Sequence, residues 1–141
     1  MKRSASASWN GPGKDGKGTI STQSGVLENA QYSFSTRFEN GKGTNPEELI
    51  GAAHAGCYSM ALSFILEGEG IKSEKIDTSA EVTIVSKDGG FEITTIHITV
   101  KGKVPGIDQT KFKEYAEKAK VGCPVSKVLK GAQISLEASL V

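Results

Sequence analysis

Residues 44–68 read Thr-Asn-Pro-Glu-Glu-Leu-Ile-Gly-Ala-Ala-His-Ala-Gly-Cys-Tyr-Ser-Met-Ala-Leu-Ser-Phe-Ile-Leu-Glu-Gly, and this stretch decides the fold. Thr44 or Asn45 can cap a helix, Pro46 fits its first turn, and the two glutamates that follow suit the positive end of the helix dipole. Small and apolar residues then continue nearly all round the axis until glycines stop the pattern. We therefore predict a long helix from about Pro46 to about Glu67 that other structure encloses on most faces.

Upstream of this helix the sequence predicts three short strands. Small polar residues alternate with apolar ones, or β-branched and aromatic residues recur, between glycine- and asparagine-rich turns at Ser4–Trp9, Gly18–Thr22 and Gln31–Phe38. We expect these segments to form a three-stranded meander.

Downstream of the helix, polar and apolar residues alternate on both sides of Asp88-Gly89-Gly90, which predicts a hairpin. No internal repeat and no long linker divides the chain, so we expect residues 1–141 to form a single α+β domain. The expected elements are strands at Asp77–Val85 and Phe91–Val104, helices at Gly106–Lys120 and from Cys123-Pro124 to about Leu129, and a last strand at Ala132–Leu140.

Composition narrows the class of protein. Seventeen basic and sixteen acidic residues leave a net charge of +1 with no basic block, so the charge gives no sign of nucleic-acid binding. Polar residues interrupt the apolar run of the long helix, which favours a buried helix of a soluble protein over a membrane span. The N-terminal stretch is polar and the chain has only two cysteines, a pattern that is not typical of a secreted disulfide-bonded protein. We expect a cytoplasmic protein with reduced thiols.

The two cysteines stand in different surroundings. Cys57 lies inside the long helix, where a free cysteine often packs as a small hydrophobic residue. Cys123 precedes Pro124 at a predicted helix start, where backbone N–H groups lower the pKa of a thiol. On these grounds Cys123 is the more reactive thiol, although a helix cap without function explains it equally well. His54 precedes Cys57 by one helical turn, but this spacing is a weak metal signal and we predict no metal and no cofactor.

Several stretches together resemble the OsmC/Ohr family, in its osmotically inducible protein C branch. They cover nearly the whole chain, and the spacing from Asn-Pro-Glu to Cys57 to Cys123-Pro124 is the most specific of them. The stretches are Ser24–Leu27, Thr36–Glu39, Gly43–Cys57, Val104–Asp108 and Ala119–Ser126. The resemblance implies a thiol-dependent peroxidase that reduces organic hydroperoxides and hydrogen peroxide in oxidative and osmotic stress defence.

The resemblance also implies a role for each matching residue, and it reverses the order of the two thiols. Cys57 matches the peroxidatic cysteine and Cys123 the resolving cysteine, which condenses with the Cys57 sulfenic acid to a disulfide. Arg37, one of two arginines in the chain, matches the cation that stabilises the thiolate. Glu47 matches the carboxylate that orients Arg37, by two parallel hydrogen bonds.

Helix geometry favours Glu47 over Glu48 for this role. At about 100° per residue, Glu47 lies about 80° around the axis from Cys57, whereas Glu48 lies about 180° away.

The resemblance also implies the α+β fold of the family, in which strongly curved antiparallel sheets wrap around long central helices in an intertwined homodimer. Apolar side chains near Cys57, such as Tyr58, Met60 and Ala61, together with Phe34, Phe38 and Ile50, would suit the alkyl part of a peroxide, and each would equally suit the core. The implied partners are a second copy of the chain, the peroxides, and a dithiol reductant, with a lipoyl-type dithiol as one candidate. The alternative is a non-enzymatic thiol sensor or ligand-binding dimer, because the same pair of thiols could report an oxidant without turnover.

Overall fold

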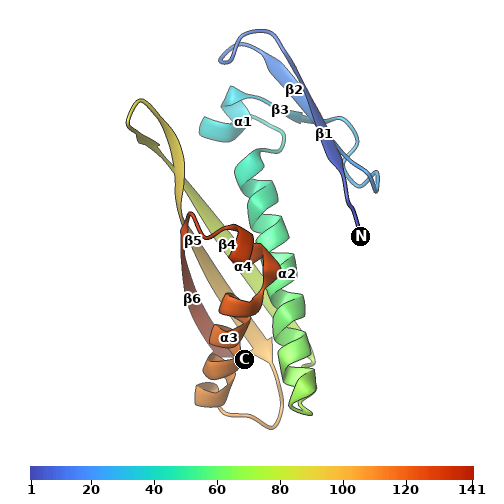
Figure 1. Cartoon of the computed structure of the whole chain (residues 1–141), viewed down its shortest axis with the longest axis vertical. Coiled ribbons are helices and arrows are strands. Elements are labelled where there is room, and N and C mark those ends of the chain that lie inside the picture. The colour runs from blue at the N-terminus through green and yellow to red at the C-terminus, as the bar shows by residue number, and fades with distance from the viewer. The chain divides into compact units, whose positions relative to one another are not determined.

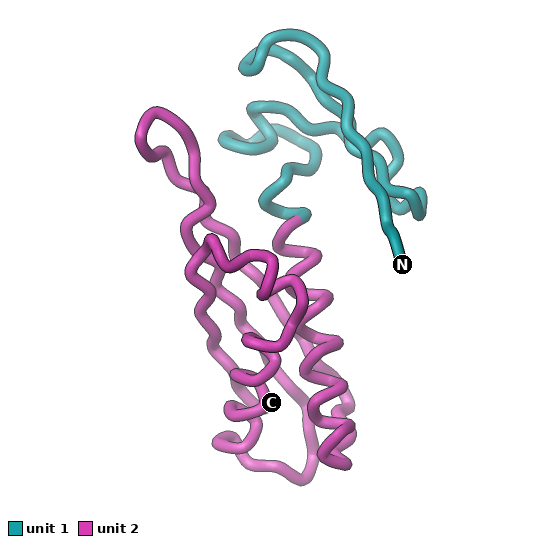
Figure 2. The backbone as a smooth tube through the Cα atoms, viewed as in Figure 1, with its two compact units in different colours: residues 1–49 teal, residues 50–141 magenta.

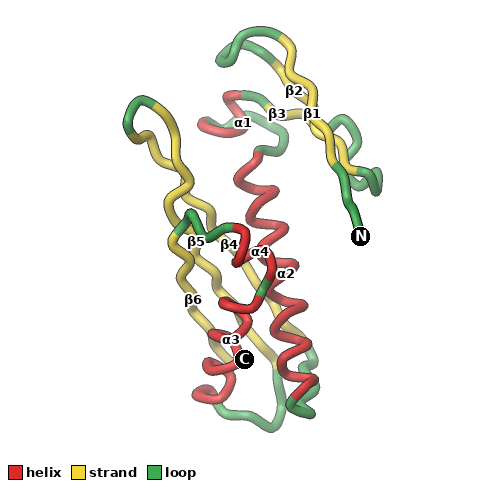
Figure 3. Tube along the Cα trace, in the orientation of Figure 1, coloured by secondary structure: helices red, strands yellow, loops and turns green.

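The computed structural model describes residues 1–141, which form two three-stranded sheets and four helices (Figure 1, Figure 3). In chain order the elements are β1 (Ala5–Asn10), β2 (Lys17–Thr22), β3 (Ala30–Tyr32), α1 (Phe34–Phe38), α2 (Pro46–Gly68), β4 (Lys75–Lys87), β5 (Gly90–Lys103), α3 (Gln109–Gly122), α4 (Pro124–Val128) and β6 (Gln133–Leu140). The chain divides into two compact units, residues 1–49 and 50–141, and the boundary falls within α2 (Figure 2).

The first unit contains the expected antiparallel meander, in the order β1-β2-β3. The expectation of a strand through Phe38 was wrong, because β3 ends at Tyr32 and α1 follows it. Ser33 caps this helix: its hydroxyl accepts the Thr36 backbone N–H at 3.2 Å, and the Thr36 hydroxyl accepts the Ser33 N–H at 2.8 Å. This reciprocal capping outweighs the strand preference of the aromatic and β-branched residues.

The second unit is built on the sheet β4-β5-β6. Asp88 and Gly89 make the predicted hairpin turn, both with positive φ (50° and 78°), which is the backbone that a two-residue turn of this kind requires. The last strand, β6, pairs with β5 in parallel, so this sheet is mixed. The chain reaches β6 through α3 and α4, as a parallel connection requires.

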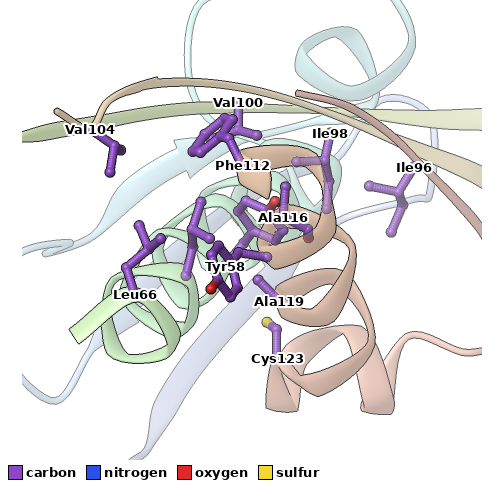
Figure 4. Close-up of a cluster of buried hydrophobic side chains, with 12 residues drawn as sticks. Tyr58, Leu66, Ile96, Ile98, Val100, Val104, Phe112, Ala116, Ala119 and Cys123 are labelled. Carbon is purple, nitrogen blue, oxygen red and sulfur yellow. Dashed lines mark hydrogen bonds between the residues drawn. The ribbon is translucent and has the colours of Figure 1, made fainter. Parts of the chain in front are cut away.

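Helices α2 and α3 pack on one face of this sheet and enclose the core (Figure 4). The fully buried core side chains are Tyr58, Leu62 and Leu66 from α2, Ile96, Ile98 and Val100 from β5, and Phe112, Ala116, Ala119 and Cys123 from α3 and its end. The predicted start of α2 is confirmed: the Asn45 side chain accepts the Glu48 backbone N–H at 2.8 Å. Helix α3 begins later than expected, after its cap Asp108.

The opposite face of α2 is uncovered in the single chain. Met60 and Phe64 on this face are 63% and 64% exposed. The side of α2 with Gly51 and Ser59 lies close to β4: a Cβ added to Gly51 would lie 3.1 Å from the Ala80 carbonyl, and the Ser59 hydroxyl lies 2.7 Å from that of Thr78. The helix expected to be enclosed on most faces is therefore enclosed on one side by its own chain.

Candidate active site

Arg37 and Glu47 form an ion pair in the first unit. Arg37 lies in the last turn of α1 and Glu47 in the first turn of α2. The guanidinium donates from Nε to Oε1 of Glu47 at 2.8 Å, and Nη2 lies 2.8 Å from the same oxygen. The parallel two-oxygen arrangement expected from the sequence is not formed, because both nitrogens approach one oxygen. Oε2 is buried without a hydrogen-bond partner.

Asn45 joins the two helices that carry this pair. Its Nδ2 donates to the Thr36 carbonyl at 2.9 Å, and its Oδ1 accepts the backbone N–H of Glu48. One buried side chain thus fixes the end of α1 beside the start of α2. The sequence identified Asn45 as a cap, but its bond to Thr36 depends on the fold and was missed.

A pocket of about 230 Å³ adjoins the exposed side of Arg37. Phe34 and Phe38 line it, with ring centroids 4.9 Å apart, and the guanidinium carbon lies 5.3 Å from the centre of the Phe38 ring. Trp9 and Tyr32 complete the aromatic wall. Phe34 and Phe38 thus line a pocket, whereas Tyr58 is a core residue whose hydroxyl donates to the Ala116 carbonyl at 2.9 Å.

The two thiols meet in the second unit, although 66 positions separate them in sequence. The sulfur atoms of Cys123 and Cys57 lie 2.8 Å apart, within hydrogen-bonding distance, and both cysteines are free. Cys123, at the junction of α3 and α4, is fully buried (Figure 4). Cys57 on α2 is half-buried. Cys57 is thus the thiol that a dissolved molecule can reach more easily.

The surroundings of Cys57 act on its pKa in opposite directions. Burial raises the pKa of the thiol above its ordinary 9.0, and the hydrogen bond and charge of Cys123 raise it further. The backbone N–H of Val125, at the start of α4, donates to the Cys57 sulfur and lowers the pKa. The helix start that was expected to act on Cys123 therefore acts on Cys57. Within the second unit the balance favours the neutral thiol, so a reactive thiolate needs a further cation.

His54 and Ser126 make a second buried contact between α2 and α4. The imidazole Nε2 lies 2.7 Å from the Ser126 hydroxyl, and the His54 side chain is fully buried. Burial lowers the pKa of His54, which keeps the ring neutral near pH 7. The sequence indicated a packed or hydrogen-bonded helix residue at His54, but gave no sign of its partner.

The structure thus brings the four predicted site residues together as two pairs, one in each unit. Arg37 pairs with Glu47, and Cys57 contacts Cys123. A thiol pair at contact distance can form a disulfide once one sulfur is oxidised. A guanidinium held by a buried carboxylate can stabilise an anion while keeping a fixed orientation.

Comparisons with known proteins identify the family of the chain. Residues 39–138 match the family model for OsmC-like proteins. The chain is 54% identical over 140 residues to Peroxiredoxin OsmC of Escherichia coli, covering 99% of this chain and 97% of that protein. It is 30% identical to the organic hydroperoxide resistance protein OhrB of Bacillus subtilis over 81% of this chain and 82% of that protein.

Solved structures share the fold. The crystal structure of OhrB from Bacillus subtilis matches with a TM-score of 0.71 over 96% of this chain and 97% of that chain. An OsmC-like protein from Mycoplasma pneumoniae, 18% identical, matches with a TM-score of 0.77 over 100% of this chain and 98% of that chain. At that identity the second match shows the fold alone.

Proposed function

The chain belongs to the OsmC family and is a cysteine-based peroxidase of peroxide defence, and on that premise we propose that Cys57 attacks the peroxide and Cys123 resolves the product. The observation that carries the assignment of roles is the contact of a half-buried Cys57 with a fully buried Cys123 at 2.8 Å. The accessible thiol meets the peroxide first, and the buried thiol is in place to react with the oxidised sulfur.

The reaction has two steps within the protein. The Cys57 thiolate attacks one peroxide oxygen, the O–O bond breaks, and the second oxygen leaves as an alcohol or water after taking up a proton. The Cys123 sulfur then attacks the Cys57 sulfenic acid, so that an S–S bond forms, the S–O bond breaks, and water leaves with the thiol proton. A dithiol restores both thiols by exchange, and a lipoyl-type dithiol is the candidate class.

Arg37 supplies the cation that the Cys57 thiolate needs. Burial and Cys123 raise the pKa of Cys57, so attack near pH 7 requires a charge that favours the thiolate. A guanidinium is a permanent cation in proteins, and Glu47 fixes the orientation of the one that Arg37 carries. The aromatic pocket beside Arg37 suits the apolar part of an organic hydroperoxide.

The active unit is a homodimer in which α2 forms part of the interface. Four exposed positions recur every four residues along one side of α2: Ala52, Gly56, Met60 and Phe64. Such a stripe is apolar and remains uncovered in the single chain, and a second copy would bury it. By length and composition α2 could also cross a bilayer. We assign α2 to an interface because its other face packs on the sheet of a folded core. With α2 buried in a dimer, we place the protein in the cytoplasm.

Steady-state turnover distinguishes this enzyme from a thiol sensor. We expect catalytic consumption of both cumene hydroperoxide and hydrogen peroxide in the presence of dihydrolipoamide, with many peroxide molecules reduced per protein. Consumption that stops after one equivalent with every dithiol tested would instead identify a sensor. Mixing Arg37→Ala subunits with Cys57→Ser subunits would show which subunit supplies the cation, since activity of the mixture requires Arg37 to act across the dimer.

A further inference from the structure

His54 is a buried titratable side chain near the thiols, and neither step of the proposed reaction uses it. It is fully buried and precedes Cys57 by one helical turn on α2. Its Nε2 contacts the Ser126 hydroxyl at 2.7 Å, and its Nδ1 is buried without a partner. A buried imidazole that makes a single hydrogen bond calls for an explanation, because the bare nitrogen loses its hydration and gains no partner.

The unpartnered nitrogen fixes the direction of the hydrogen bond. Buried N–H groups without an acceptor are rarer than buried acceptors without a donor. The proton of the neutral ring therefore lies on Nε2, and Nε2–H donates to the Ser126 hydroxyl oxygen. The contact is a directed hydrogen bond from α2 to α4, which depends on the hydroxyl at position 126.

Three polar groups of the segment 123–126, a thiol, a backbone N–H and a hydroxyl, contact two adjacent turns of α2. The Cys123 thiol and the Val125 N–H contact the Cys57 sulfur, and the Ser126 hydroxyl contacts His54. The two contacts to Cys57 change as its sulfur is oxidised, since the sulfur gains an oxygen and then a covalent bond. The contact between His54 and Ser126 involves no reacting atom, so it can hold the segment in place throughout the reaction.

We propose that the His54–Ser126 hydrogen bond is a positioning contact for the resolving step, which holds α4 on α2 so that Cys123 reaches the oxidised Cys57 before a second peroxide does. This inference rests on the proposed function. The competing reaction joins a second peroxide to the sulfenic acid: one oxygen is transferred to give the sulfinic acid, and an alcohol or water leaves. His54 and Ser126 thus set the resistance to over-oxidation and leave the first attack unchanged.

Ser126→Ala tests the proposal, with Ser59→Ala as its matched control. Ser59, like His54, lies on α2. Its hydroxyl donates to the hydroxyl of Thr78 on β4 at 2.7 Å, so its removal costs α2 a hydrogen bond to β4 instead of one to α4. Turnover with cumene hydroperoxide and dihydrolipoamide, followed by mass spectrometry, gives the fraction of Cys57 converted to sulfinic acid per turnover. We expect this fraction to rise about threefold to tenfold in Ser126→Ala, as the loss of one hydrogen bond allows. Ser59→Ala and Ser126→Thr, which keeps the hydroxyl, should stay near the native value.

A second measurement separates positioning from general loosening of the fold. The single-turnover rate of the first attack should stay within about twofold of the native rate in Ser126→Ala, while disulfide formation slows. His54→Leu should give the same fraction of over-oxidised Cys57 per turnover as Ser126→Ala. The double variant should give no higher fraction than either single variant, because both substitutions remove the same contact. His54→Leu also serves if Ser126→Ala folds poorly.

Two results would overturn the inference. One is that Ser126→Ala and His54→Leu both convert the same fraction of Cys57 to sulfinic acid per turnover as the native protein. The other is an equal rise in Ser59→Ala, which would show that any lost contact of α2 has this effect. Failure of the proposed function would look different, since the native protein itself would then form no disulfide between Cys57 and Cys123.

Discussion

Replacing Glu47 by glutamine removes one negative charge at nearly constant shape, and so measures what the carboxylate does for Arg37. Nε and Nη2 of Arg37 both lie 2.8 Å from Oε1, and Oε2 is buried without a partner. Hydrogen bonds to charged groups contribute about 1.5–3 kcal/mol, against about 0.5–1.5 kcal/mol for neutral ones. The new amide group must also either face the Arg37 donors or occupy the buried position of Oε2 without an acceptor. We expect the free energy of unfolding to fall by about 1–3 kcal/mol.

The same substitution should slow the oxidation of Cys57. A guanidinium that holds the thiolate about 1–2 kcal/mol less firmly corresponds to a rate about 5- to 30-fold lower. Stopped-flow measurement of a single turnover gives the rate, and thiol alkylation against pH should show that the pKa of Cys57 rises in the variant.

Glu48→Gln is the matched control for this experiment. Glu48 is exposed, and its bond to Asn45 uses the backbone N–H, which the substitution keeps. Its effect on stability should stay within about 0.5 kcal/mol, with unchanged kinetics. Equal effects of the two substitutions on the rate would refute the role given to the ion pair of Arg37 and Glu47.

Three further predictions concern Arg37, His54 and the dimer. Arg37→Lys should slow peroxide reduction although it keeps the charge, because an ammonium lacks the planar set of donors that Glu47 orients; native kinetics would show that charge alone suffices. Burial lowers the pKa of His54 below 6.5 in the folded protein, so as the pH falls the imidazole is protonated first in the unfolded chain. The stability that neutral His54 contributes is complete above pH 6.5. It is lost as the pH falls through the pKa of the folded state. Urea unfolding from about pH 7.5 to about pH 5 should therefore lose up to about 1.4 kcal/mol more per pH unit in the native protein than in His54→Leu, and parallel curves would contradict this. Met60→Glu should weaken the dimer in light scattering by burying a charge, whereas Val121→Glu, on α3 and similarly exposed, should not; a native monomer would rule the interface out.

Elements with a local signal could be predicted from the sequence. The start of α2 is fixed by Asn45 and Pro46, and the hairpin by Asp88 and Gly89, so neighbouring residues suffice to specify both. The segment that ends at Phe38 shows the limit. Its aromatic and β-branched residues favour a strand, but the reciprocal cap at Ser33 starts a helix there.

The candidate site required both local motifs and the fold. The resemblance of the stretches around Arg37, Cys57 and Cys123 gave the residues, and the structure places them in pairs. The sequence could not show that the Val125 N–H acts on Cys57, because the two residues are 68 positions apart and meet only when α4 packs on α2. The contact of His54 with Ser126 was out of reach for the same reason.

Mass spectrometry of the protein after one equivalent of cumene hydroperoxide tests the central claim most directly. The native protein should lose two hydrogens and yield a single peptide pair linked through Cys57 and Cys123. Cys57→Ser should consume no peroxide and retain its fold, and Cys123→Ser should consume the one equivalent, keep one added oxygen on Cys57, and gain further oxygen only when excess peroxide is supplied. Peroxide consumption at the native rate by Cys57→Ser, or a native product without the bond between Cys57 and Cys123, would contradict the account.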